Sequence, residues 1–153
     1  SDQSFFGNDF ERPLNERGKS DAPLMAKRLA DKKFKIDALV SSPAIRAKKT
    51  AELFSETLKM PATGIIFISA LYHASPEIFY EVVSGLPDEL DIVAVFSHNP
   101  GISYFINSLN TNTRIDNMPT CGIFGITAAI TSWSGFSKAK KEFLFFDYPK
   151  NVF

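Results

Sequence analysis

Apolar residues recur every three or four positions in several segments of the chain, which is the spacing of one buried helix face. The first such segment begins after Asn15, a predicted N-cap, and runs to about Lys33, with Ala22, Met25 and Leu29 among Lys, Arg and Asp. Similar spacing predicts helices over residues 42–58, 76–83 and 99–109. We expect Ser42 to cap the helix over 42–58, with Ile45 on its buried face.

Short, continuous apolar runs separate these helices, at residues 36–41, 65–68 and 91–97. Such runs are typical of strands buried on both faces of a parallel sheet, and the run over 91–97 is the clearest of them. Residues 122–130 and 142–147 predict two later strands, with Ser134 and Gly135 in the turn between them. Alternating strands and helices predict an α/β fold, a three-layer sandwich with a mostly parallel central sheet flanked by helices and an antiparallel edge.

Composition and charge narrow the classes of function. A chain of 153 residues suits one domain, and 17 basic residues balance 17 acidic ones. This balance argues against nucleic-acid partners and a polybasic membrane anchor, and no apolar run approaches the roughly 18 residues of a membrane span. The only cysteine, Cys121, cannot form an internal disulfide, which favours the cytoplasm.

Two junctions between a strand and a helix carry residues suited to binding an anion. Arg46 lies in the first turn after the strand over 36–41, and His98 directly follows the strand over 91–97, with Asn99 beginning the next helix. Ligands of open α/β sheets bind beyond the carboxyl ends of strands, where helix N-termini offer free N–H groups. Taken singly, each residue has a structural alternative, a solvated arginine or a capping histidine. Together they favour a site for phosphate or another oxyanion.

Other chemistries lack their residues. His73 and His98 are the only histidines and there is no cysteine pair, so no zinc constellation is predicted. Nucleotide-binding glycine loops and the serine nucleophile elbow are absent from the sequence. Cys121 is followed six positions later by Thr127 and not by the arginine of a cysteine phosphatase. We expect Cys121 to be a small, buried and inert strand residue.

Three segments in order carry a resemblance to a known family: Phe10–Gly18, Ser41–Ala51 and Ser97–Gly101. The chain resembles the histidine phosphatase superfamily, specifically its short SixA-type phosphohistidine phosphatase branch, over nearly its whole length. The resemblance implies a phosphoglycerate-mutase-like fold. Residues 118–120, which end in Thr120, are also similar to the family's segment that leads into a late strand.

The resemblance implies a metal-independent phosphatase without an organic cofactor. In this family a histidine of an Arg-His motif after the first strand attacks phosphorus and becomes phosphohistidine. Arg46 matches the family's second arginine and His98 its second histidine, which bind the phosphoryl oxygens. We expect Asn99 to bind phosphate beside them at the helix start. A cationic pocket of this kind stabilises the charge that develops during phosphoryl transfer.

The Arg-His motif has no counterpart in the sequence, and Ser1 stands about where the residue after the motif belongs. We therefore expect one domain over residues 1–153 that lacks its first strand. The natural chain should extend about ten residues before Ser1, enough for a strand and a short turn that deliver the nucleophile.

His73 lies in the loop where larger family members carry a carboxylate general acid, and it is either a proton donor or a surface residue. The leading hypothesis is hydrolysis of phosphohistidine on a protein, because a short chain without a lid insertion leaves an open pocket. The alternatives are a phosphatase for small phosphate esters and a catalytically inactive phosphate-binding module.

Overall fold

The computed structural model describes residues 9–151, which form four α-helices and five strands. The helices are α1 (Glu16–Asp31), α2 (Ile45–Thr57), α3 (Pro76–Ser84) and α4 (Gly101–Ser108). The strands are β1 (Ala38–Ser41), β2 (Ile65–Phe67), β3 (Val93–Phe96), β4 (Ile123–Ala128) and β5 (Lys141–Asp147). Short 3₁₀ turns are η1 (Asp9–Glu11), η2 (Ala62–Gly64), η3 (Ser69–Leu71) and η4 (Trp133–Gly135).

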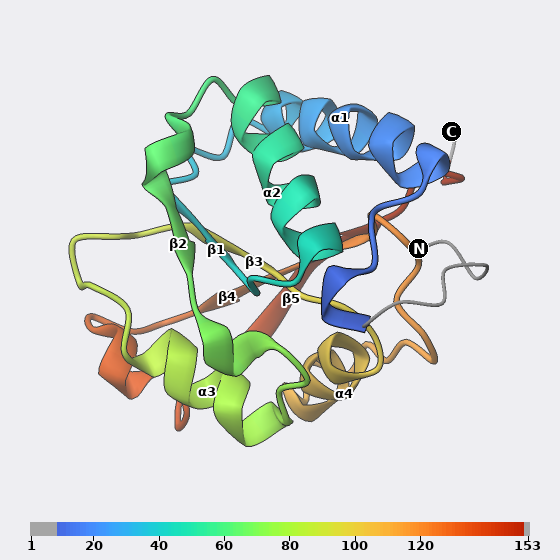
Figure 1. Ribbon diagram of the computed structural model, residues 1–153. Helices are drawn as coiled ribbons and strands as arrows, with labels where there is room; N and C mark the ends of the chain where they lie inside the picture. Colours follow the sequence, from blue (N-terminus) through green and yellow to red (C-terminus); the bar gives the residue numbers. More distant parts are fainter. Residues whose placement is uncertain (1–8, 152–153) are drawn as a thin grey trace.

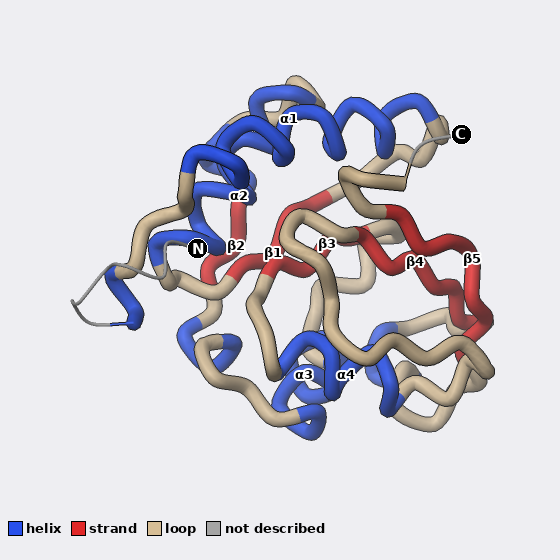
Figure 2. Tube along the Cα trace, turned by 90° about the vertical axis from the view of Figure 1, so that its right-hand side faces the viewer, coloured by secondary structure: helices blue, strands red, loops and turns tan. Residues whose placement is uncertain are grey.

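The strands form a middle layer between two pairs of helices. A parallel sheet has the order β2-β1-β3, and β4 and β5 form a separate antiparallel pair. Helices α1 and α2 lie on one side of the strands and α3 and α4 on the other (Figures 1 and 2). This arrangement confirms the predicted α/β sandwich with a parallel sheet flanked by helices.

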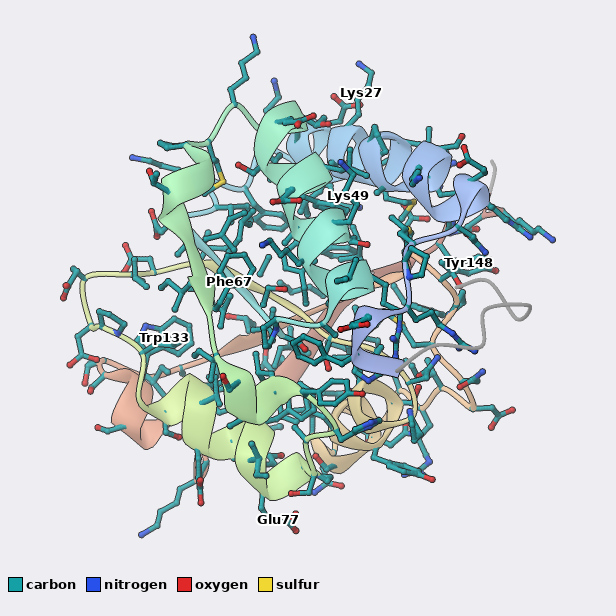
Figure 3. The ribbon with its side chains drawn as sticks, viewed as in Figure 1. Lys27, Lys49, Phe67, Glu77, Trp133 and Tyr148 are labelled. Carbon is teal, nitrogen blue, oxygen red and sulfur yellow. The ribbon has the colours of Figure 1, made fainter. Side chains whose placement is uncertain are left out.

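Helix boundaries follow the signals in the sequence for α1 and α3. The Asn15 side chain accepts a hydrogen bond from the Gly18 N–H at 2.9 Å, which caps α1. Ser75 caps α3, Pro76 occupies its first turn and Gly85 follows its last residue. The polar faces point outward, since Lys27 of α1 and Glu77 of α3 extend away from opposite sides of the molecule (Figure 3).

Two apolar clusters, one on each face of the sheet, hold the layers together. Met25 of α1, Leu39 of β1 and Phe54 of α2 belong to one cluster. Phe79 of α3 and Phe105 of α4 belong to the other, where their rings stack at 4.7 Å. Both clusters contact β1, whose four residues are fully buried, so β1 is the centre of the fold.

Helix α2 corrects two expectations. It begins at Ile45 and not at Ser42, because the Ser42 hydroxyl accepts the Ala44 N–H at 3.2 Å before the chain becomes helical. Ile45 is exposed, and Ala47 and Ala51 take the buried face. These small residues allow α2 to pack closely on the sheet.

Strand β3 is less buried than its apolar sequence predicts. All four of its residues remain partly exposed, whereas β1 is buried throughout. The reason is topological, because β1 pairs on both edges, while β3 pairs with β1 on one edge only within residues 9–151. Cys121 is a further correction: it lies in the turn before β4, with φ of 60°, and not within a strand.

Candidate active site

Arg46 lies where the chain passes from β1 into α2. The preceding Ser41 and Ser42 are fully buried, and the Ser41 hydroxyl donates to the Ser42 carbonyl at 2.8 Å. This anchored turn brings Arg46 into the first turn of α2, partly buried, beside the helix N-terminus. Free N–H groups at that terminus add positive potential next to the guanidinium.

His98 occupies the corresponding position between β3 and α4 and is partly buried. Gly101, the first residue of α4, packs closely against the loop that holds Ala74, because a Cβ at this position would lie 2.7 Å from the Ala74 carbonyl oxygen. Ser97 also donates to the Leu71 carbonyl at 3.4 Å. The junction that carries His98 is therefore held against the loop over residues 71–75.

One cavity brings the predicted residues together. Arg46, His98, Asn99, His73 and Thr120 all line it, and its volume is about 920 Å³. Arg46 and His98 therefore share a cavity, which also extends along β3 and β4, and their role as a site stays a prediction. Ser1, the remaining candidate, lies outside the described residues.

The side chain of Asn99 has a structural task. Its Nδ2 donates to the Met118 carbonyl at 2.7 Å, and its Oδ1 accepts the Ser103 hydroxyl. Ser103 Oγ in turn accepts the Met118 N–H at 2.9 Å. Asn99 therefore holds the segment that ends in Thr120 against α4. Phosphate binding by Asn99 stays a prediction, and we expect its backbone N–H, not its side chain, to make that contact.

His73 reaches the site from a different part of the sequence. Its ring centroid lies 5.5 Å from that of His98 and 4.1 Å from that of Tyr72. Tyr72 also lies 5.6 Å from His98 and 5.1 Å from Phe10, so the four rings form one cluster at the cavity. His73 has φ of 55°, a left-handed conformation that is uncommon for a residue with a side chain.

Arg12 is a site residue that the sequence interpretation did not single out. It follows η1, is partly buried and lines the same cavity as Arg46. Its signal in the sequence was weak, because an arginine before a helix usually lies in solvent. Only the packing of η1 near the ends of the strands brings it to the site.

Chemically, this end of the cavity suits a tetrahedral oxyanion. Arg12 and Arg46 contribute guanidinium groups, His98 and His73 contribute imidazoles, and α2 and α4 begin beside them. Cys121 is not suited to nucleophilic attack, because burial and the nearby Asp21 carboxylate raise the pKa of its thiol to about 11.

Residues 9–151 include neither a candidate metal site nor a helix that could cross a membrane. No group of three or more His, Cys, Asp or Glu residues is placed to hold a metal ion. None of the described helices has the length and apolar character needed to cross a membrane.

Comparison with known proteins gives matches in sequence and fold. The model of the histidine phosphatase superfamily (branch 1) matches residues 2–65. The phosphohistidine phosphatase SixA of Escherichia coli (strain K12) is 26% identical over 121 residues, which are 78% of this chain and 75% of that protein.

Solved structures share the fold. A structure of the protein histidine phosphatase SixA complexed with tungstate has a TM-score of 0.80 at 24% identity and covers 95% of this chain and 90% of that one. The phosphoglycerate mutase of Plasmodium falciparum has a TM-score of 0.53 at 26% identity, over 65% of each chain. Taken together, these matches show that the chain is similar in sequence to the histidine phosphatase superfamily and shares its fold with SixA.

Proposed function

We propose that this protein hydrolyses phosphohistidine on a protein substrate through a covalent phosphohistidine intermediate. The observation that carries the proposal is the meeting of Arg46 and His98 in one cavity, each beside the beginning of a helix. Similarity to the histidine phosphatase superfamily supports a phosphatase, and the similar E. coli protein is a phosphohistidine phosphatase.

Arg46 and His98 bind the phosphoryl group in this mechanism. The planar guanidinium of Arg46 donates parallel hydrogen bonds to the phosphoryl oxygens, and the imidazolium of His98 adds a positive charge from the opposite junction. Phosphoryl transfer spreads negative charge over the equatorial oxygens, and donors already in place stabilise that charge without reorganisation.

The exposed rim of the cavity supports a substrate that is part of a protein. His73 and Thr120, which both line the cavity, are exposed. An open rim allows a side chain presented by another protein to enter. A small phosphate ester is held better in a site that encloses it.

The nucleophile in this proposal is a histidine on a strand that precedes Ser1. His73 and His98 are the only histidines of the 153 residues, and His98 serves as a phosphate ligand. The proposed strand lies between β3 and β4 and runs parallel to β3. Its carboxyl end then meets Arg46 and His98, which is where an attacking imidazole is needed.

The shape of the cavity supports this position for the strand. The cavity follows β3 from Asp91 to His98 on one side and β4 from Gly122 to Ala128 on the other. Within residues 9–151, no backbone pairing joins the facing edges of β3 and β4. Residues 91–98 extend roughly 25 Å at the usual rise per residue, enough length for one further strand.

The path of the chain after the proposed strand also fits. Phe10 lies against Tyr72 and Tyr72 against His98, so the described chain begins near the carboxyl ends of β1 and β3. A parallel strand in the cavity between β3 and β4 ends at this same edge. A short turn therefore suffices to connect the two.

A test of the proposed function uses the protein as its gene encodes it. A histidine-phosphorylated protein domain should lose its phosphate with a higher kcat/KM than small phosphate esters, and alkaline quenching should trap phosphohistidine on the enzyme. Faster turnover of small esters would support an ester phosphatase instead. Phosphate binding without any turnover would support the inactive binding module.

The strand position has its own measurement. Hydrogen exchange should be slower at the amides of β3 and β4 in the encoded protein than in the 153-residue chain, because a paired edge protects its N–H groups. Equal exchange of these amides in both chains would contradict the proposed strand.

A further inference from the structure

The loop that carries His73 is held rigidly on both sides. Leu71 before it is fully buried, and Ala74 after it is 4% exposed. The Leu71 carbonyl accepts the Ser97 hydroxyl, and the Ala74 carbonyl lies against Gly101. Both contacts join this loop to the segment that carries His98. An exposed imidazole at the tip of so anchored a loop keeps a constant position relative to the phosphate ligands.

The position of His73 differs from that of the phosphate ligands. Arg46 and His98 follow the strands β1 and β3 and are partly buried, whereas His73 is exposed at the rim. Its ring packs against Tyr72 and lies edge-on to His98, with an interplanar angle of 75°. His73 is therefore an exposed imidazole next to His98, on the solvent side of the cavity from which a phosphorylated side chain can enter.

We propose that His73 is the proton donor to the leaving group. This inference rests on the proposed phosphatase function and adds a catalytic residue to it. The His73 ring contacts Tyr72 and His98 from the β3 junction, and Arg46 from α2 and Arg12 beside η1 line the same cavity. His73 is the exposed imidazole in this set, and an imidazole exchanges protons readily near neutral pH.

The proton and the electrons balance over two steps. In the first, the nucleophilic imidazole forms a bond to phosphorus, and the bond from phosphorus to the leaving nitrogen or oxygen breaks with its electron pair. The His73 imidazolium donates its proton to the released group, which leaves as neutral imidazole or alcohol. In the second, water attacks the phosphoenzyme and gives its proton to neutral His73, and inorganic phosphate and the free nucleophile are restored.

A series of phosphate monoesters tests this role on the protein as its gene encodes it. p-Nitrophenyl phosphate releases a stable anion and needs no proton, whereas phenyl and alkyl phosphates release poorer leaving groups. In the His73→Asn variant kcat/KM should fall about a hundredfold or more for the poor leaving groups and stay within about twofold for p-nitrophenyl phosphate. Asparagine suits this test because it adopts the left-handed conformation readily and has no titratable proton.

A neighbouring variant completes the test. Tyr72→Phe, which keeps the ring and removes the hydroxyl, should not show this selective loss for the poor leaving groups.

The outcomes separate the two proposals. Wild-type protein that cleaves no phosphorylated substrate contradicts the proposed function itself. An active wild type with an equal loss across all leaving groups in His73→Asn overturns the proton-donor role and leaves His73 as a structural residue. A dependence on the leaving group that appears in Tyr72→Phe and not in His73→Asn assigns the proton to Tyr72.

Discussion

Replacing Gly101 by alanine tests how closely the two halves of the site are packed. The added Cβ would lie 2.7 Å from the Ala74 carbonyl oxygen, closer than Cβ atoms approach backbone oxygens. The contact is with backbone, so either α4 or the loop that holds Ala74 must move. Overpacking of this kind costs about 1–3 kcal/mol.

The net cost is smaller than the overlap alone implies. Alanine gains up to about 1 kcal/mol over glycine in a helix, although less in the first turn. We therefore expect Gly101→Ala to lower the free energy of unfolding by about 1–2 kcal/mol, which corresponds to a decrease of about 2–8 °C in Tm for a domain of this size. Because His98 and His73 flank this contact, kcat/KM should fall as well.

Gly64→Ala is the matched control. No heavy atom lies within 4 Å of a Cβ built at Gly64, and its φ is not in the left-handed region. This change should stabilise the protein by about 0.4–1 kcal/mol through the unfolded state and leave activity unchanged. Thermal denaturation and kcat/KM should be measured for both variants. A Gly101→Ala protein with wild-type Tm and activity would refute the close-packing argument.

Three further predictions concern single residues. Arg46→Lys keeps the charge but loses the planar guanidinium, so kcat/KM should fall at least about tenfold, which corresponds to about 1.4 kcal/mol of transition-state stabilisation. Near-normal steady-state kinetics would place Arg46 outside the site. His98→Asn should weaken phosphate binding most at acidic pH, because only wild-type His98 gains a charge there. Calorimetry from about pH 5.5 to 8.5 checks this, and a difference in phosphate affinity between wild type and variant that does not change with pH would contradict a cationic role for His98. Cys121, with the pKa of its thiol raised to about 11, should react with iodoacetamide at pH 7 only when the protein unfolds, and mass spectrometry that finds rapid labelling of the native protein would contradict this.

Local signals in the sequence predicted the start of α1 correctly. Asn15 caps this helix through a hydrogen bond from Gly18, three residues away, which depends little on the rest of the fold. The meeting of Arg46 and His98 was also predictable, because β1 and β3 are parallel and their carboxyl ends share one edge.

Other features depend on contacts between distant segments. Ile45 matched the apolar spacing of α2, yet its exposure is set by how α2 lies on the sheet. The side chain of Asn99 bonds the Met118 carbonyl, a partner 19 residues away, which the sequence does not identify. The apolar sequence of β3 predicts a fully buried strand, but its burial depends on a neighbouring strand at its second edge.

The site likewise combines residues placed by local sequence signals with residues placed by contacts between distant segments. The order of residues along the chain is enough to predict which residues end strands and begin helices, and hence that an arginine and a histidine lie at one edge of a parallel sheet. His73 and Arg12 join them through contacts across the fold, because the packing of Leu71, Ala74 and Gly101 orients the His73 loop and the packing of η1 brings in Arg12. Hydrogen bonds between near neighbours can be inferred from order along the chain, whereas contacts across the fold arise from the shapes of the packed layers.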